Sequence, residues 1–591
     1  YKLAATSNTD QPIEGKAQDF TAANYGFIVY MKTAACFNYL RAYLGNDLYD
    51  KCMREYFKAW KFKHPQPKDL RKIVEKNTKK DLSWFFDDLI GTNKVIDYKI
   101  TTKRKPDTKS RVTYGWMKYE EGVGVKNVGG IAAPIFVAGY AYDTIADARW
   151  YQGLNGSTIA SFPNGSFDRV VIDPFYDMPD INHSNNFYKY KIKGKKLFAK
   201  TEPLKLKFLL GYENPRRSTL FYTPVVGGNA YDGWQAGVAF YNSFAFQKPV
   251  EWAVMPLYGI RSGKINGSLS LCVNSNYRES TLLSKISYTL TGATYSYLPH
   301  IFGTNIDFTN RFFRISPGVK VDFKPSTPRS PYRQRLHVLF TQVGEMEKTT
   351  CEGDCEGLIA NDTLKLSSFV DLEYSFSSSK VFIPWTATTH ARYGPGFAFV
   401  TAEYKWSRVL GVRGKKVHAR VYAGAFLFNN TTSSRYNLRG DGIRGYYDYE
   451  YAGVFIGRNE TQGVWAQQFM EGFANIKTPT AYAQSNKWNV ALNLSGDLPI
   501  PYFKVFADVA AAPYTTLSNG QTTTGVRAVY DAGFNLSLFW GALNIYVPCL
   551  VSKRIADEYS ANSVEFYERI RFTLNLLPLA PNRLSKTIKL F

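Results

Sequence analysis

Apolar and polar residues alternate along much of the chain from residue 188 onward. One run sets an apolar face against a polar or small one: Trp488, Val490, Leu492 and Leu494 against Asn489, Ala491, Asn493 and Ser495. A period of two predicts a β-strand with one apolar face. Residues 204–210, 370–376 and 534–540 follow the same pattern. Several runs have about 9–11 residues, the length with which a tilted strand crosses a lipid bilayer.

These repeated runs predict an antiparallel transmembrane β-barrel over residues 188–591. A large soluble β-sandwich also shows alternation, but the runs repeat too many times for one sandwich. Charges stand in the middle of the polar faces, as a water-filled or plugged lumen allows. The chain ends in an aromatic residue, Phe591, as many outer-membrane barrels do. About 400 residues, at roughly 25 per strand and loop, indicate about 16 strands.

Residues 1–92 have helical periodicity instead. Apolar residues recur at helical spacing in one stretch: Phe27, Tyr30, Ala34, Phe37, Leu40 and Leu44. Gly45 is placed to end that helix, and a second helix is expected from Asn46 to Trp60. The prolines of His64-Pro65-Gln66-Pro67 predict a rigid, non-helical connector. Short helices are expected after Asp69 and near Asp81.

Residues 93–187 contain short β-type runs separated by turn residues such as Gly129-Gly130 and Asn155-Gly156. This pattern predicts a small β-sandwich. A polar loop from Asp180 to Asn186 is a natural boundary. The sequence therefore predicts a multidomain chain with a helical part (1–92), a β-sandwich (93–187) and a barrel (188–591).

The composition agrees with a barrel rather than with membrane-spanning helices. Among 591 residues, 16% are aromatic, with 42 Tyr and 41 Phe, and barrels place such residues in girdles at both membrane interfaces. The mean hydropathy is only −0.28, and no run of apolar residues is long enough for a transmembrane helix. Alternating strands keep the average polar, so this value does not argue against a barrel.

The net charge of +24 is compatible with nucleic-acid binding. However, Lys and Arg are scattered along strands and turns, which favours anionic lipid head groups and a polar lumen over nucleic acid. The expected partner is therefore outer-membrane lipid.

The sequence starts at Tyr1 without a signal peptide, so we expect a segment that includes an export signal to precede it. Six Cys do not make a disulfide framework. Cys351 and Cys355 either close a small loop disulfide or remain two thiols. Two sulfurs without a nearby His do not predict a structural zinc site.

A series of short motifs occurs in order within the first 90 residues: Asp10-Gln11-Pro12, Asn24-Tyr25-Gly26, Val29-Tyr30-Met31-Lys32-Thr33-Ala34, Trp60 to Asp69, and Leu82 to Phe86. Together they resemble the zinc aminopeptidase family (membrane alanyl aminopeptidases, gluzincins). The resemblance implies the helical end of a thermolysin-like catalytic domain. One departure is Thr33, where the family usually has Gly after the Lys.

The resemblance implies that Tyr30 is catalytic. In the family a zinc-activated water attacks the scissile carbonyl, and the phenol hydroxyl donates a hydrogen bond to the oxygen that becomes negative. Losing one such donor typically costs about 10²–10³ in rate. The alternative is that Tyr30 is a core aromatic on an apolar helix face.

The family binds zinc with a His-Glu-x-x-His helix and a further Glu, and this chain has no such motif. Its six histidines are far apart: His64, His183, His300, His337, His390 and His418. The resemblance places the zinc helix upstream of Tyr30, so the zinc ligands are expected before residue 1. His64, next to Pro65, is expected to be structural.

The barrel region carries a second resemblance. Asn437 to Tyr446, and within it Arg444-Gly445-Tyr446, resembles the Arg-Gly-aromatic signature of the BamA/TamA-like surface-antigen barrels. The resemblance implies a 16-stranded barrel, periplasmic N-terminal domains and a loop that folds back into the lumen. Arg444 would anchor this loop, with Asp508 as a possible partner. The alternative is an ordinary Arg-Gly turn.

These observations lead to a first hypothesis, an outer-membrane-anchored zinc aminopeptidase whose N-terminal part lies in the periplasm of a bacterium. The second is a barrel for protein insertion, secretion or transport, with a degenerate peptidase-like module that binds peptides or unfolded proteins. The third is a mainly structural barrel anchor. Peptide specificity, the state of the lumen and the oligomeric state stay open.

Overall fold

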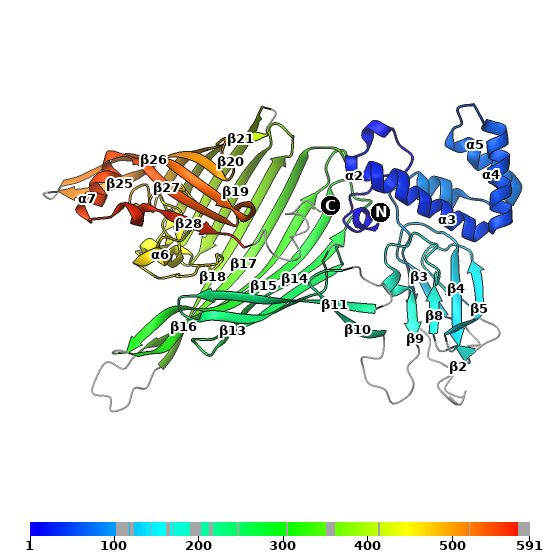
Figure 1. Ribbon diagram of the computed structural model, residues 1–591, viewed down its shortest axis with the longest axis horizontal. Helices are drawn as coiled ribbons and strands as arrows, with labels where there is room; N and C mark the ends of the chain where they lie inside the picture. The colour runs from blue at the N-terminus through cyan, green and yellow to red at the C-terminus, as the bar shows by residue number, and fades with distance from the viewer. Residues whose placement is uncertain are drawn as a thin grey trace. The chain divides into compact units, whose positions relative to one another are not determined.

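A computed structural model describes most of the chain: residues 1–101, 117–118, 123–141, 143–160, 166–167, 169–189, 202–211, 217–244, 247–302, 305–349, 361–411, 414–518 and 521–576. Cys351, Cys355 and Phe591 lie outside these described residues, so the loop disulfide stays a prediction. The chain divides into two compact units (Figure 1). The first comprises Tyr1–Phe221 with Ser326–Arg329, and the second Tyr222–Pro325 with Ser330–Phe591.

The first unit starts with the predicted helices: α1 (Lys2–Thr6), η1 (Ala17–Asp19), α2 (Ala22–Asn24), η2 (Tyr25–Lys32), α3 (Thr33–Leu44), α4 (Asn46–Trp60), α5 (Pro67–Thr78) and η3 (Trp84–Ile90). Gly45, with a φ of +83°, separates α3 from α4, a conformation that favours glycine. Helix α5 begins earlier than predicted, because Pro67 occupies its first turn. A capping box between Gln66 and Asp69 fixes this start.

Antiparallel strands follow the helices. A three-stranded sheet has the order β1 (Tyr98–Thr101), β3 (Val123–Asn127), β6 (Ser157–Ala160), and a four-stranded sheet the order β5 (Thr144–Tyr151), β4 (Ile135–Ala141), β8 (Arg169–Ile172), β9 (Phe187–Lys189). A short pair joins β2 (Met117–Lys118) to β7 (Ser166–Phe167). A 3-10 turn, η4 (His183–Asn185), precedes β9.

One hydrophobic core serves both the helices and these sheets. Cys36, Tyr39 and Leu40 from α3 belong to the same buried cluster as Ile135 and Val137 from β4. The sequence separates residues 1–92 from 93–187, whereas the two segments bury their apolar faces against each other. The helices of the first unit are therefore held by the strands that follow them.

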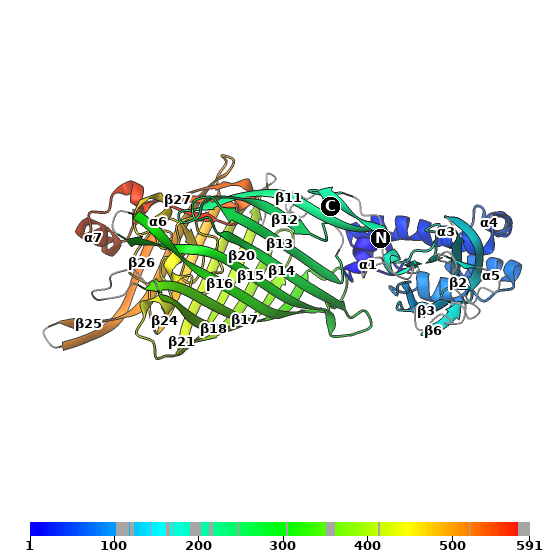
Figure 2. The same cartoon turned by 90° about the horizontal axis from the view of Figure 1, so that it is seen from below.

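The second large element is a sheet of 17 strands in chain order, almost all of it in the second unit. Its strands are β10 (Glu202–Phe208), β11 (Arg217–Asn229), β12 (Gly233–Tyr241), β13 (Val250–Gly259), β14 (Ile265–Asn276), β15 (Leu283–Phe302), β16 (Asn305–Phe323), β17 (Tyr332–Thr349), β18 (Asn361–Ser378), β19 (Trp385–Gly394), β20 (Phe397–Leu410), β21 (Lys415–Asn429), β24 (Trp488–Asp497), β25 (Phe503–Ser518), β26 (Gln521–Leu538), β27 (Leu543–Val551) and β28 (Arg571–Leu574). Figure 2 shows many of them side by side. Every neighbouring pair from β12 to β28 is antiparallel.

The large sheet has 17 strands among the described residues, close to the predicted number of about 16. The prediction of a barrel is corrected in one respect: within the described part of the chain the sheet is not closed, because β28 does not pair with β10 or β11. The last strand among the described residues, β28, is also short, with only four residues paired to β27. Among the described residues, no helix is long and apolar enough to cross a membrane.

In this sheet polar side chains are buried and apolar side chains are exposed, which is the reverse of the pattern in a soluble protein. On β24 the polar residues Asn489 and Asn493 are buried, whereas the side chains of Val490, Leu492 and Leu494 are each about 40% exposed. On β18 Asp371 is buried between the exposed Val370 and Leu372. The apolar face predicted from alternation is therefore the outer face.

The chain between β21 and β24, residues 430–487, lies on the inner face of the sheet. It contains η5 (Ser434–Tyr436), β22 (Ile443–Arg444), η6 (Gly445–Tyr447), α6 (Gly463–Ala466) and β23 (Phe469–Met470). Its Asn459 N–H donates to Tyr231 Oη near the start of the sheet, and its Gln468 bridges to Phe572 in β28. One loop reaches both ends because the sheet curls around it (Figure 1). We name residues 430–487 the inner loop.

Candidate functional sites

Tyr30 lies on η2 and is 62% exposed, so it is not a core aromatic, which was the alternative interpretation. Its ring meets that of Tyr25 edge to face, with 5.8 Å between the centroids. A hydrogen bond with Tyr25 raises the pKa of Tyr30. A tyrosine hydroxyl, whose ordinary pKa is about 10, keeps its proton at neutral pH and can act as a donor. The neighbouring Lys32 points the other way and is buried, with its Nζ 5.5 Å from the Tyr1 ring centroid.

Two buried amides fix the start of the helix that presents Tyr30. Asn24 Nδ2 donates to Thr9 O at 2.8 Å and to Gln11 Oε1 at 3.0 Å. Gln11 Nε2 donates to Asp19 O at 2.9 Å, and Gln11 Oε1 accepts from Thr21 N at 3.0 Å. Both residues belong to the motifs that carry the aminopeptidase resemblance, but neither has a structural or catalytic role that the sequence alone predicts. Their role in the structure is to hold the chain that leads into η2.

The described residues do not fit a zinc site. No group of three or more His, Cys, Asp or Glu side chains among them could hold a metal ion. His64 is exposed between α4 and α5, and His390 and His418 bond to separate partners, Asp371 and Ser407. That the zinc ligands lie upstream of residue 1 stays a prediction.

A buried charge cluster joins α1 to the β-strands of the first unit. His183 Nδ1 lies 2.5 Å from Lys2 Nζ, and His183 Nε2 lies 3.3 Å from Asp173 Oδ2. Asp180 is fully buried and accepts hydrogen bonds from the backbone N–H groups of Tyr98 and Asn182. From the sequence this segment was only a polar loop and a boundary.

Asp97 belongs to the same cluster. Burial raises the pKa of its carboxyl group to about 7, and the negative charge of Asp180 acts in the same direction. The hydrogen bond from Asn185 Nδ2, at 2.7 Å, opposes this shift. Burial also lowers the pKa of Lys2. The cluster therefore changes its charge near neutral pH.

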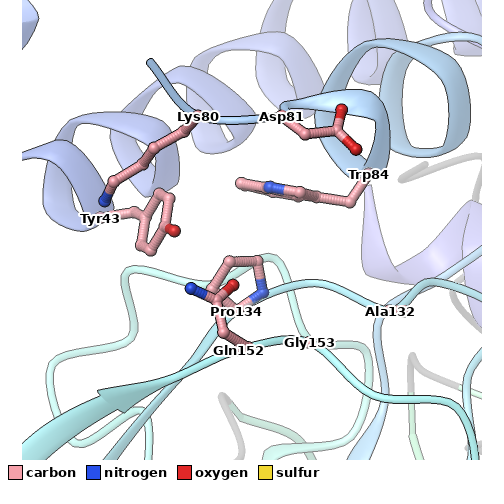
Figure 3. Close-up of a pocket in the computed structure, with 8 residues that line it drawn as sticks. All are labelled: Tyr43, Lys80, Asp81, Trp84, Ala132, Pro134, Gln152 and Gly153. Carbon is pink, nitrogen blue, oxygen red and sulfur yellow. The ribbon is translucent and has the colours of Figure 1, made fainter. Parts of the chain in front are cut away.

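A cavity of about 330 Å³ lies where the helices meet the strands (Figure 3). It is lined by Tyr43, Lys80, Asp81, Trp84, Ala132, Pro134, Gln152 and Gly153. Tyr39 donates its hydroxyl to Pro134 O and so fixes one wall from α3. A Cβ on Gly153 would stand 1.9 Å from Ala132 O, so this position requires glycine. The side chains in its lining that carry titratable groups are those of Tyr43, Lys80 and Asp81.

The inner loop does not use the predicted ion pair between Arg444 and Asp508. Arg444 Nε lies 3.5 Å from Asp441 Oδ2, three residues earlier in the chain. Asp508 faces Lys477 Nζ at 3.4 Å and accepts from Asn493 Nδ2 at 2.9 Å. Arg444 therefore pairs with Asp441 in its own turn, whereas Asp508 pairs with Lys477.

Two other arginines are more deeply buried than Arg444. Arg439 Nη2 lies 2.9 Å from Asp441 Oδ1, and Arg571 Nη1 on β28 donates to Asp441 O at 2.7 Å. The guanidinium of Arg439 also stacks 3.8 Å above the Tyr447 ring centroid. Asp441 thereby joins the loop to the last strand. The sequence signal is Arg439-Gly440-Asp441, which lies within the segment Asn437 to Tyr446 that carries the resemblance.

Gly445 and Tyr446, also predicted as part of the anchor, have different positions. A Cβ on Gly445 would stand 2.0 Å from Arg458 O, so the loop can approach itself here only with glycine. The Tyr446 side chain is half exposed, with its ring 5.3 Å from the Arg435 guanidinium. The anchor role of the Arg-Gly-Tyr turn stays a prediction.

Further ion pairs join the inner loop to the strands around it. Arg392 on β19 contacts Glu450 in the loop at 2.5 Å and Asp371 on β18 at 2.7 Å. Arg435 in the loop contacts Glu345 on β17 at 2.8 Å. These contacts fill the inside of the curled sheet with paired charges.

The comparisons with known proteins concern the two units separately. Residues 3–89 match the model of the Peptidase family M1 domain. The match contains Gln11, Asn24 and Tyr30, and it supports a peptidase-like module at the start of the first unit. No curated protein matches the chain.

Solved structures of outer-membrane type are similar only at a low level. CdiB from Acinetobacter baumannii is 10% identical, with a TM-score of 0.27 over 58% of this chain and 60% of that chain. BamA from Haemophilus ducreyi lacking POTRA domains 1–3 is 9% identical, with a TM-score of 0.31 over 56% of this chain and 69% of that chain. Values this low carry no argument, so the interpretation of the sheet rests on its own geometry.

Proposed function

We propose that this chain is the C-terminal part of an outer-membrane-anchored zinc aminopeptidase that removes residues from the N-terminus of peptides. The observation that carries the proposal is the exposed Tyr30 hydroxyl on η2, within the segment that matches the Peptidase family M1 domain. The ligands of the zinc ion are expected upstream of residue 1. Peptides or unfolded proteins are the proposed substrates.

Tyr30 acts by donating a hydrogen bond. When a peptide carbonyl is attacked, negative charge develops on its oxygen, and a donor held in advance at that oxygen lowers the barrier. The fixed start of η2 at Gln11 and Asn24 supports this role, because a donor must be held in place to contribute to catalysis. The exposed side chain leaves room for a substrate.

The outward apolar residues of the sheet support the anchor. In water, exposed Leu and Val side chains on so many strands would form a large apolar surface that is prone to aggregation, whereas the hydrocarbon of a bilayer solvates them. A sheet can enter a bilayer only when its backbone groups are bonded to neighbouring strands, and strands β12 to β26 have a paired neighbour on both sides, whereas the edges of the described sheet do not. A bacterial outer membrane with the peptidase-like unit in the periplasm is the proposed location.

The test is the hydrolysis of an aminoacyl anilide by the protein purified from its own membrane, with zinc counted in the same sample. Tyr30→Phe is expected to lower kcat about 10²–10³-fold with the zinc content unchanged. Tyr176→Phe is the matched control, because it removes the hydroxyl of another exposed tyrosine of the first unit and leaves Tyr30 and its partner Tyr25 in place. Full activity of Tyr30→Phe, or the absence of zinc-dependent hydrolysis in the wild type, would contradict the proposal.

A second candidate function is supported by the inner loop. A curled sheet filled by an ion-paired loop also suits a barrel for protein insertion, secretion or transport, in which the peptidase-like module binds peptides without cleaving them. Bound zinc and hydrolysis favour the first function. A zinc-free protein that binds peptides and conducts ions across planar bilayers favours the second.

A further inference from the structure

The end of α4, the connector after it and the start of α5, whose positions Figure 1 shows, are one continuous stretch of chain. This stretch combines exposed aromatic residues with a run of positive charges. We name residues 57–68 the aromatic-basic tip. Its aromatic and basic residues are Phe57, Lys58, Trp60, Lys61, Phe62, Lys63, His64 and Lys68. No Asp or Glu occurs among these residues, and all of them except Trp60 are exposed.

Phe62 is the most prominent residue of the tip. Its side chain is 102% exposed, so it touches almost nothing in the first unit. Its φ of +61° lies in the left-handed region, which is strained for a residue with a bulky side chain. Lys61 N donates to Phe57 O and Lys63 N to Trp60 O, and these bonds end the helix so that Phe62 protrudes. Phe57, one helical turn earlier, is 68% exposed.

These features define the chemistry of a partner. A protruding aromatic ring favours an apolar environment, and the exposed lysines around it favour nearby anions. Lys63 Nζ also donates to Ala59 O at 2.9 Å, and its charge stays at the surface. An anionic lipid surface supplies both, because its phosphates lie directly above its hydrocarbon. A fluid surface also opens around one protruding ring, whereas a protein partner would need a preformed pocket for it.

We propose that the aromatic-basic tip binds an anionic lipid surface. Phe62 and Phe57 enter the boundary between head groups and acyl chains, and Lys61 and Lys63 contact the phosphates. This contact is separate from the strands of the sheet and does not depend on peptidase activity. It would hold the first unit against a membrane at a defined point.

The experiment uses the full chain held in nanodiscs of neutral lipid, so that the outer face of the sheet is already covered. The discs are mixed with vesicles of phosphatidylcholine alone or with added phosphatidylglycerol, and bound protein is measured by flotation. The wild type is expected to float with the anionic vesicles only. Lys61→Gln with Lys63→Gln is expected to lower the affinity about thirtyfold, and Phe62→Ala about tenfold.

The matched control is Lys51→Gln with Lys99→Gln, which removes the same charge from exposed positions outside the tip. Equal loss in the control and tip variants, or equal binding to neutral and anionic vesicles, would overturn the proposal. Retention on polyglutamate without vesicle binding would also overturn it and would point to an acidic protein. Because Phe62 is exposed, its substitution tests binding without unfolding the unit.

Discussion

Asp97 makes the stability of the first unit depend on pH. The pKa of its carboxyl group rises from 3.8 to about 7 in the folded chain, so the folded state holds a proton that the unfolded state releases. The stabilisation is complete below pH 3.8 and is lost as the pH rises through 7. We expect Asp97→Asn, which keeps the oxygen that accepts from Asn185, to stabilise the unit at pH 8 relative to the wild type and to change little near pH 3, where the carboxyl group is protonated in both the folded and the unfolded state. Amide exchange of β1, compared between the two proteins at each pH, measures this, and equal exchange at pH 8 would contradict it.

At the scale of single residues, the sequence indicates which residues have a role better than it indicates which residues they contact. The resemblance singled out Tyr30, and the structure exposes its side chain. It also singled out Arg444, but could not predict that Asp441 lies beside it and that Lys477 is paired with Asp508. Long-range pairs depend on how a loop folds back, and no local pattern encodes that. The buried cluster of Asp97, Asp180 and His183 was missed for the same reason.

Gly153 tests how tightly the helices are joined to the strands. A Cβ at this position would overlap Ala132 O at 1.9 Å, so Gly153→Ala is expected to cost about 1–3 kcal/mol in the stability of the first unit. Gly130→Ala is the matched control, because its Cβ would meet only Lys94 side-chain atoms at 3.4 Å or more. Amide exchange of β4 in the full chain measures both. A cost for Gly130→Ala as large as that for Gly153→Ala would contradict the account.

At the scale of elements, periodicity located most strands and helices. The strands alternate because one face carries exposed apolar side chains and the other face carries polar side chains that are buried next to the inner loop. Leu492 and Asn493 are examples of the two faces. The connector with Pro65 and Pro67 was predicted, but helix α5 starts at Pro67 because proline suits a first turn. The sequence does not single out the aromatic-basic tip, because Lys and Arg are scattered over the whole chain. The lysines of the tip lie close together because they are exposed at the end of α4 and in the short connector that follows it.

Arg392 connects the wall of the curled sheet to the inner loop. It contacts Asp371 in the sheet and Glu450 in the loop. Arg392→Met leaves the buried Glu450 without this cation, and breaking a buried pair costs about 3–5 kcal/mol. We expect the loop to loosen and the ion conductance in planar bilayers to rise above that of the wild type. Arg408→Met, at an exposed position on β20, is the control, and unchanged conductance in Arg392→Met would show that this contact does not hold the loop.

At the scale of the whole molecule, the alternating runs predict a membrane-embedded sheet, but they do not predict at which strand the sheet ends. The number of strands and the open edge depend on pairing between distant segments, and β28 contributes only four residues to it. The Arg-Gly-Tyr resemblance predicts a loop that folds back into the lumen, and the inner loop contacts both ends of the described sheet.

The most direct test of the account is carbene footprinting of the protein in its own membrane, with a diazirine probe dissolved in the lipid and the labelled residues mapped by mass spectrometry. The account predicts label on Val490, Leu492 and Leu494 and none on Asn489 or Asn493, because only the first three face outward from β24. Label on both sets, or on neither, would contradict a sheet whose outer face lies in lipid.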